Sequence, residues 1–106
     1  MNKEERFKIY DEAEKEWGLI AQYDQAIEEM GELIVAINKY KRKCLYNEYS
    51  HNTKVEDNLA EEIADVTMCL EQLTNYVGEE KVENIFNEKL KKLQEEIEYM
   101  KNRKKD

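Results

Sequence analysis

The sequence predicts an all-α, four-helix bundle-like single domain over residues 1–106. Hydrophobic residues make up 41% of the chain and charged residues 40%. The apolar positions recur at spacings of three and four, which is typical of amphipathic helices and not of disorder. Proline is absent, and Gly18, Gly31 and Gly78 are the only glycines, so few breaks are expected. A domain this short is often helped by self-association, which favours a homo-oligomer.

The first expected helix covers residues 3–17, and Gly18 can end it, because glycine is common just past a helix terminus. The second covers residues 19–43. A polar and aromatic loop follows over residues 44–54. The apolar positions of the second expected helix share one face: Leu19, Tyr23, Ala26, Ile27, Met30, Leu33, Ile34 and Ile37.

Thr53 and Glu56 fit a capping box, so a third helix is expected over about 54–77. Its predicted buried seam has six members: Leu59, Ile63, Val66, Leu70, Leu73 and Val77. Gly78 separates it from a fourth helix over about 79–102. The seam of that helix is Val82, Phe86, Leu90, Leu93, Ile97 and Met100.

The composition excludes several classes of protein. A formal net charge of -8 argues against nucleic-acid binding, which needs a basic face. An acidic protein can still bind a triphosphate when a metal ion bridges the two. No apolar run approaches the ~20 residues of a membrane span. The N-terminal residues 1–5 lack the apolar stretch of a signal peptide, so a cytoplasmic location without membrane contact is expected.

One carboxylate falls where a buried residue is expected. On a helical wheel with Val66 at zero, the six seam residues fall between about -20° and +60°. Glu62 falls at about -40°, next to that stripe, and Asp65 at about -100°, on its rim. A buried carboxylate without a partner is very costly. Glu62 must therefore stay protonated, meet a cation or bind a metal.

The second helix carries a matching edge. Glu29 and Glu32 lie on one side of its apolar stripe, with Gln22 on the same edge. Residues at i and i+3 are neighbours on a helix, so Glu29 pairs with Glu32 and Glu62 with Asp65. Two facing helices with such pairs make a site for a hard cation such as Mg²⁺ or Mn²⁺.

A simpler interpretation also exists for acidic pairs. The chain is rich in glutamate, and the same spacing occurs at Glu80 and Glu83 and at Glu95 and Glu98. Those pairs are interpreted as solvated faces. The position of Glu62 against an apolar stripe is what favours a metal site over this alternative.

These residues resemble a known family. Glu28–Glu32, followed by Glu62–Asp65, is similar to the EExxE…ExxD signature of the all-α NTP pyrophosphatases, the MazG-like superfamily. The resemblance covers roughly residues 15–100. The separation between Glu32 and Glu62 is at or slightly beyond the long end of the family's usual spacing, and the excess is attributed to the loop around residues 46–52.

The resemblance implies an enzyme and its metal. It implies hydrolysis of a (d)NTP between the α- and β-phosphates to (d)NMP and pyrophosphate, in a nucleotide-pool cleaning role. Glu29, Glu32, Glu62 and Asp65 would hold Mg²⁺, with Mn²⁺ as a possible substitute. Relatives act as dimers or tetramers, which implies a homodimer or homotetramer here.

Other roles are less well defined by the residues. Glu28 and Glu61 flank the expected ligands and are either candidate catalytic bases or solvated neighbours. Candidates for substrate binding are Gln22, Lys39, Arg42 and Lys89, with surface lysines and arginines as the alternative for the last three. Trp17 either stacks on a base or belongs to the core.

Two other functions are compatible with the pattern. One is a non-enzymatic helical bundle that serves as an interaction module and uses its acidic residues for solubility. The other is the related phosphoribosyl-ATP pyrophosphohydrolase of histidine synthesis, which shares only the general carboxylate pattern. Base and sugar specificity stay open among canonical dNTPs, dUTP or dCTP, and modified nucleotides.

Overall fold

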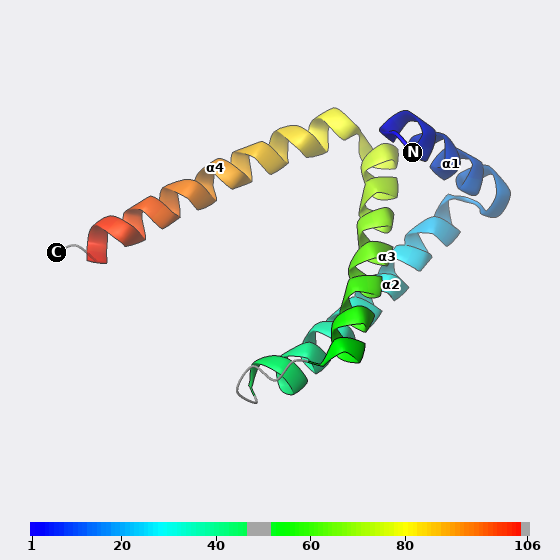
Figure 1. Ribbon diagram of the computed structural model, residues 1–106. Helices are drawn as coiled ribbons and strands as arrows, with labels where there is room; N and C mark the ends of the chain where they lie inside the picture. The colour runs from blue at the N-terminus through cyan, green and yellow to red at the C-terminus, as the bar shows by residue number, and fades with distance from the viewer. Residues whose placement is uncertain (47–51, 105–106) are drawn as a thin grey trace. The chain divides into compact units, whose positions relative to one another are not determined.

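Every regular element in the described part of the chain is a helix, as predicted. The computed structural model describes residues 1–46 and 52–104. Its elements are α1 (Lys3–Trp17), α2 (Leu19–Tyr40), the π-helix η1 (Lys41–Leu45), α3 (Thr53–Val77) and α4 (Glu79–Lys104) (Figure 1). Among the described residues, no helix is long and apolar enough to cross a membrane.

One glycine separates α1 from α2, and another separates α3 from α4. Gly18 has a φ of 90° between α1 and α2, and Gly78 has a φ of 130° between α3 and α4. A side chain is strained at such positive φ values, whereas glycine is not. The amide of Gly18 donates to the carbonyl of Glu14 at 2.8 Å and closes the last turn of α1. Both predicted helix ends are confirmed.

The second helix ends differently from the prediction. Regular α-helix was expected through residue 43, but α2 stops at Tyr40 and the chain continues as the wider turn η1. Cys44, expected in the loop, lies in η1 and is buried. The remainder of the predicted loop over residues 47–51 lies outside the described residues.

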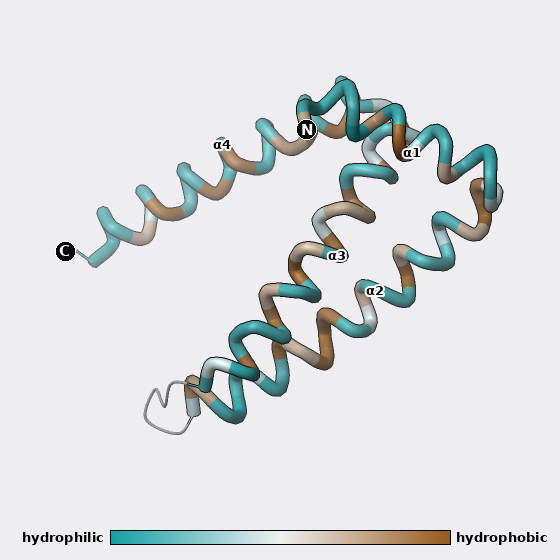
Figure 2. Tube along the Cα trace, turned by 45° about the vertical axis from the view of Figure 1, so that its right-hand side comes forward, coloured by the Kyte–Doolittle hydropathy of each residue, from teal (hydrophilic) through white to brown (hydrophobic). Residues whose placement is uncertain are grey.

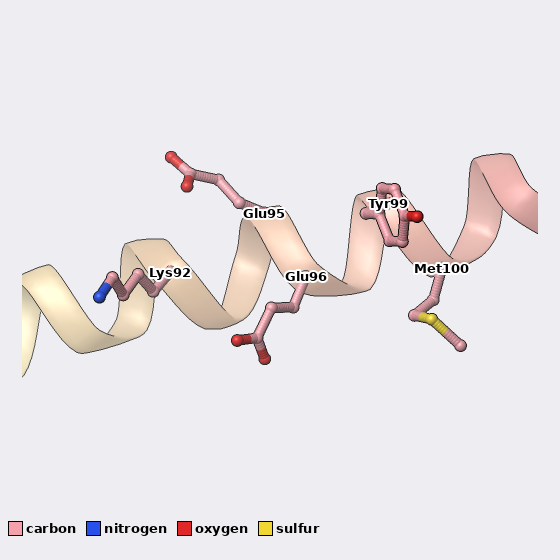
Figure 3. A pocket seen from close by; sticks show the side chains of 5 residues that line it. All are labelled: Lys92, Glu95, Glu96, Tyr99 and Met100. Carbon is pink, nitrogen blue, oxygen red and sulfur yellow. The ribbon is translucent and has the colours of Figure 1, made fainter.

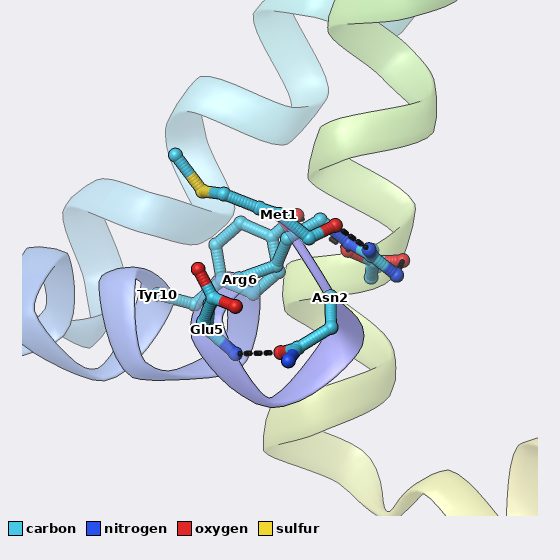
Figure 4. A network of polar contacts seen from close by, with 6 residues as sticks. Met1, Asn2, Glu5, Arg6 and Tyr10 are labelled. Atoms are coloured by element: carbon cyan, nitrogen blue, oxygen red, sulfur yellow. Dashed lines mark hydrogen bonds and ion pairs between the residues drawn. The ribbon is translucent and has the colours of Figure 1, made fainter.

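The predicted capping box is also wrong. Thr53 is already the first residue of α3, and the Oδ1 of Asn52 accepts a hydrogen bond from the amide of Val55 at 3.2 Å. At the start of α1, the Oδ1 of Asn2 accepts in the same way from the amide of Glu5 at 2.8 Å (Figure 4). Asparagine is among the best residues at this position, because its short side chain reaches the free amides of the first turn.

The chain forms two compact units, Met1–Leu73 and Thr74–Asp106. The first contains α1, α2, η1 and most of α3, and it holds every buried residue of the described chain. In the second, α4 has no buried residue. Hydrophobic positions recur along α4 between hydrophilic ones, so the predicted seam exists as an exposed stripe (Figure 2). The bundle-like packing is therefore that of α1, α2 and α3.

The buried face of α3 is rotated from the predicted seam. Ile63 and Leu70 were expected inside, but each is 49% exposed. The buried residues are Val55, Val66, Cys69 and Gln72. On the facing helix, Ala26 and Ala36 are the buried positions. Small residues allow close approach, so the two helices meet along the edge that carries the carboxylates.

A polar network ties α1 to α3 (Figure 4). The guanidinium of Arg6 donates to both carboxylate oxygens of Glu71, at 2.6 and 3.1 Å. The hydroxyl of Tyr10, a buried residue, donates to Glu71 at 2.6 Å. These hydrogen bonds lower the pKa of Glu71. Burial, aided by Glu71, raises the pKa of Tyr10 to about 12. The network holds α1 against the pair formed by α2 and α3.

Candidate metal centre

Three carboxylates from two helices meet inside the first unit. Glu29 and Glu32 of α2 and Glu62 of α3 each bring one oxygen within 4.8 Å of the others. Glu29 and Glu62 are half-buried, and Glu32 is exposed. The i,i+3 spacing places the two glutamates of α2 on one edge, and the close approach of α3 adds the third. Three of the four residues expected to bind a metal are therefore together.

Two oxygens of this cluster have no partner. The Oε2 atoms of Glu29 and Glu62 are buried without a hydrogen bond. The one hydrogen bond from a neighbouring amide comes from Gln25, whose Nε2 donates to the other oxygen of Glu29 at 2.7 Å. Buried polar atoms nearly always have a partner, and a buried charge without one is costly. The donor set consists of carboxylates alone, and it fits a hard divalent cation.

The electrostatics of the cluster agree with this fit. Removal from water raises the pKa of Glu29, and the charges of Glu32 and Asp65 raise it further. Removal from water also raises the pKa of Glu62, followed by the charges of Asp65 and Glu29. Both effects disfavour the ionised form. A bound cation would reverse them, and it would compete with protons for the same oxygens.

Asp65 lies at the edge of the cluster. It is half-buried on α3 but does not belong to the group of oxygens within 4.8 Å. Its charge nevertheless raises the pKa values of Glu29, Glu62 and Cys69. Asp65 therefore lies near the three carboxylates, and its role as a fourth metal ligand stays a prediction.

The two candidate bases differ in their relation to the cluster. Glu28 and Glu61 are both exposed. The charge of Glu61 contributes to the raised pKa of Glu62, whereas Glu28 has no such effect on the cluster in the structure. Neither side chain is held by a hydrogen bond that would fix it toward the three carboxylates.

The basic candidates are spread along the chain. Lys39 on α2 and Arg42 in η1 are exposed, and they follow Glu32 by about two and three helical turns. Lys89 is exposed on α4, which belongs to the second unit. Their contact with phosphate stays a prediction.

A cavity of about 230 Å³ adjoins the cluster, and it is lined by Glu29 of the cluster and by the neighbouring Asp65. Its remaining wall is mostly apolar and comes from α1, α2 and α3. Prominent members are Tyr10, Trp17, Gln22, Gln25, Met68, Cys69 and Gln72. Gln22 and Trp17 were candidate site residues from the sequence, whereas Gln72 was not. The available signal was its position three residues after Cys69, on the carboxylate edge of α3.

Trp17 is not a core residue. Its side chain is 69% exposed, although it lines the cavity. The alternative that placed this tryptophan in the core is therefore wrong. An aromatic ring at the mouth of a cavity is free to stack on a ligand.

A concave surface on α4 lacks the features of a site (Figure 3). Its side chains all come from one helix: Lys92, Glu95, Glu96, Tyr99 and Met100. In Figure 3 they extend in different directions and do not converge on a common point. The cavity in the first unit, by contrast, is enclosed by three helices.

Comparisons with known proteins give no match. No protein-family model matches this chain, and neither a curated protein nor a solved structure shows significant similarity to it.

Proposed function

We propose that this protein is a magnesium-dependent nucleoside triphosphate pyrophosphohydrolase of the MazG-like kind, which cleans the cytoplasmic nucleotide pool. The observation that carries the proposal is the pair of buried carboxylate oxygens without partners, on Glu29 and Glu62, in a cluster of three carboxylates. In this proposal the substrate is a (d)NTP and the products are (d)NMP and pyrophosphate.

Each acidic residue has a defined role in this proposal. Glu29, Glu32, Glu62 and Asp65 hold Mg²⁺, or Mn²⁺ in its place. When bound, the ion neutralises triphosphate oxygens and makes a water more acidic. Gln25 orients Glu29 through the 2.7 Å hydrogen bond. Catalysis is then mainly a matter of positioning and electrostatic stabilisation.

Glu61 is the better placed of the two candidate bases. It directly precedes Glu62 on α3, and its charge contributes to the raised pKa of Glu62. An exposed carboxylate can take a proton from an attacking water and return it to solvent. Glu28 lies on α2 without an equivalent link and is the weaker candidate.

The adjoining cavity supports a nucleotide over inorganic polyphosphate. It is mostly apolar, and it is lined by Glu29 of the acidic cluster and by the neighbouring Asp65. A nucleoside in the cavity would extend its phosphates toward the carboxylates. Exposed Trp17 is available to stack on the base. Lys39 and Arg42 of the first unit are proposed to meet phosphates.

A homodimer or homotetramer is part of the proposal. Large aliphatic side chains on α2 and α3 are exposed: Ile27 is 69% exposed, Ile34 60%, Ile63 49% and Leu70 49%. Exposed apolar patches often mark protein interfaces. A second copy of the chain would cover them. Light scattering at micromolar concentration is expected to give a multiple of 12.8 kDa, and a monomer mass would contradict this part.

The direct test is pyrophosphate release from a panel of NTPs and dNTPs, with Mg²⁺ and with EDTA. We expect release that requires the metal and disappears in Glu62→Gln. The matched control is Glu80→Gln, which removes a similar charge from an exposed acidic pair on α4. It should retain activity.

The same experiment separates the enzyme from a non-enzymatic helical module. A folded protein that releases pyrophosphate from no nucleotide would favour the module. That alternative also predicts that Glu62→Leu stabilises the protein equally with and without Mg²⁺, since the glutamate would then be only a poorly solvated charge.

A further inference from the structure

The cavity beside the acidic cluster contains a pair of glutamine amides. Gln72 of α3 is the one buried side-chain amide in the described chain, with 8% exposure. Its Nε2 donates to the Oε1 of Gln22 on α2 at 3.1 Å. Both side chains line the cavity. Gln25, the third glutamine of the cavity, already donates to Glu29 and does not belong to the pair.

The pair has unused hydrogen-bonding capacity. A side-chain amide offers two N–H donors and an acceptor oxygen. The single bond leaves the Oε1 of Gln72 and the Nε2 of Gln22 without a partner among the described residues. Neither atom is sealed from solvent, unlike the buried oxygens of Glu29 and Glu62. The pair therefore presents one acceptor and one donor, side by side, to a mostly apolar cavity.

The size of the cavity limits what these amides can meet. Its volume is about 230 Å³. An apolar cavity of roughly 150 Å³ holds a benzene ring, and sites for larger ligands begin near 300 Å³. One six-membered ring with polar edge atoms fits, whereas a fused two-ring base would have to extend into solvent.

We propose that Gln22 and Gln72 read the hydrogen-bonding edge of a pyrimidine base, and that they accept keto and amino pyrimidines alike. The inference rests on the proposed function and specifies its substrate class. Uracil presents an acceptor beside an N–H donor, and cytosine presents an amino donor beside an acceptor.

The pair can match either arrangement. If both amides rotate by half a turn, Gln22 becomes the donor to Gln72, and the positions of the free donor and free acceptor are exchanged. The amide oxygen and nitrogen are nearly identical in shape, so both arrangements fill the same space. Each retains the one hydrogen bond between the two residues. Selection by base size is therefore expected without strong selection between uracil and cytosine.

The first test compares kcat/KM for dUTP, dCTP, dATP, dGTP and a deoxyribose triphosphate that lacks a base. For the wild type, we expect dUTP and dCTP within about 3-fold of each other and both purine nucleotides about 10-fold or more lower. Gln72→Met keeps the shape but removes the hydrogen bonds. It should lower kcat/KM for both pyrimidines about 10- to 100-fold, mainly through KM.

The base-free substrate and a control variant exclude a structural effect. Gln72→Met should leave kcat/KM for the base-free triphosphate unchanged. Gln94→Met, on exposed α4, should leave every substrate unchanged. An equal loss with the base-free substrate would overturn the inference.

A second variant tests the exchange of donor and acceptor. In Gln22→Glu the new carboxylate has no N–H, so Gln72 must always donate to it. Only acceptors then face the base. Cytosine then keeps the hydrogen bond from its amino group and loses the one to its N3, whereas uracil keeps the one from its N3–H and loses the one to its keto oxygen. The kcat/KM values for dCTP and dUTP should therefore both fall about 10-fold or more relative to the base-free triphosphate. A loss confined to one of the two pyrimidine nucleotides, or no loss for either, would overturn the inference.

A binding measurement separates this inference from the proposed hydrolysis. Trp17 is the sole tryptophan and lines the cavity, so its fluorescence can report binding of dCMP, dUMP and dAMP in EDTA. One outcome is that no triphosphate is hydrolysed, while both pyrimidine monophosphates bind to the wild type and not to Gln72→Met. That outcome would support recognition of the base by Gln22 and Gln72 and would contradict the proposed hydrolase function. If purine triphosphates are hydrolysed as fast as pyrimidine triphosphates, the hydrolase function is supported and the proposed recognition of pyrimidines is overturned. If the protein neither binds the monophosphates nor hydrolyses any triphosphate, both the base recognition and the hydrolase function are overturned.

Discussion

Two groups of carboxylates lie in the first unit, and their hydrogen-bonding requirements are met in opposite ways. Glu71 accepts two hydrogen bonds from Arg6 and one from Tyr10, and its pKa is lowered. Glu29 and Glu62 each retain a buried oxygen without a partner, and their pKa values are raised. Glu62 and Glu71 are the same residue type on the same helix.

The difference indicates that the hydrogen bonds of Glu71 stabilise the fold, whereas the cluster around Glu62 is a candidate site. The partners of Glu71 are already part of the chain, so the network joins α1 to α3 without any ligand. The cluster around Glu62 gathers like charges whose cost the described chain does not offset. A protein tolerates such an arrangement where something else binds, and perturbed carboxylates beside a cavity are typical of functional sites.

The largest expected difference between the two groups of carboxylates is in enzymatic activity. Glu62→Gln should lower kcat for nucleotide hydrolysis about 100-fold or more, because it removes a proposed ligand of the ion that stabilises the transition state. Glu71→Gln, the matched change in the satisfied network, should retain activity within about 10-fold. Steady-state pyrophosphate release checks both variants. Similar losses in both would mean that the two groups do not differ in function.

The two groups of carboxylates should also differ in their response to Mg²⁺. Mg²⁺ at about 100 times its Kd should stabilise the wild type by about 2.7 kcal/mol, because it binds the folded state. The stabilisation should persist in Glu71→Gln and vanish in Glu62→Gln. Urea unfolding with Mg²⁺ and with EDTA measures it. A stabilisation that survives in Glu62→Gln would place the metal elsewhere.

A smaller effect is expected on the stability of the metal-free protein. Glu71→Gln weakens the ion pair with Arg6, whose side chain is 37% exposed and therefore screened by solvent. The expected loss is about 1 kcal/mol in the free energy of unfolding. Glu62→Gln in EDTA should instead be neutral or stabilising, since it removes a charge without a partner. Urea midpoints of the two variants in EDTA should therefore move in different directions.

The smallest effect is the dependence of stability on pH in EDTA. The raised pKa values of Glu29 and Glu62 mean that the folded state binds more protons than the unfolded state. Their contribution to stability should therefore grow as pH falls from neutral toward about 4.5, the ordinary pKa of glutamate. The lowered pKa of Glu71 has the opposite sign, and its contribution is lost below about pH 4.5.

Thermal unfolding across this range checks both signs. Tm in EDTA should rise on mild acidification and fall under stronger acid. The rise should be smaller in Glu62→Gln, and Mg²⁺ should reverse it, because protons then displace the metal. A Tm that falls steadily from neutral pH in EDTA, in both wild type and variant, would contradict the assignment of Glu29 and Glu62.

The predictions from sequence succeeded where the interactions are local. Gly18 and Gly78 end helices because their positive φ values suit glycine, and this requirement is visible in the sequence. The cap of α3 was misassigned by one residue, since Asn52 and Thr53 are both good capping residues and only the geometry shows which one accepts. The end of α2 was placed too late, because nothing local distinguishes a π-turn from the α-helix that it continues.

The site was predictable in part. The pairing of Glu29 with Glu32 follows from helical spacing, and the meeting of both with Glu62 agrees with the expectation from facing helices. The amide pair of Gln22 and Gln72 was not predictable as a pair, because its members are 50 residues apart and meet only across the α2–α3 contact. The partners of Glu71 on α1 are distant in the same way.

The sequence by itself determined the helices and the carboxylate pairs, because both depend on interactions within about four residues along the chain. Only the tertiary structure decided which face of each helix is buried. The large aliphatic stripe of α3 was the expected choice, but Ile63 and Leu70 remain half exposed. Ala26 and Ala36 allow α2 to approach the other edge. That choice depends on the fit between two surfaces, and it encloses Glu29 and Glu62 together with the cavity beside them.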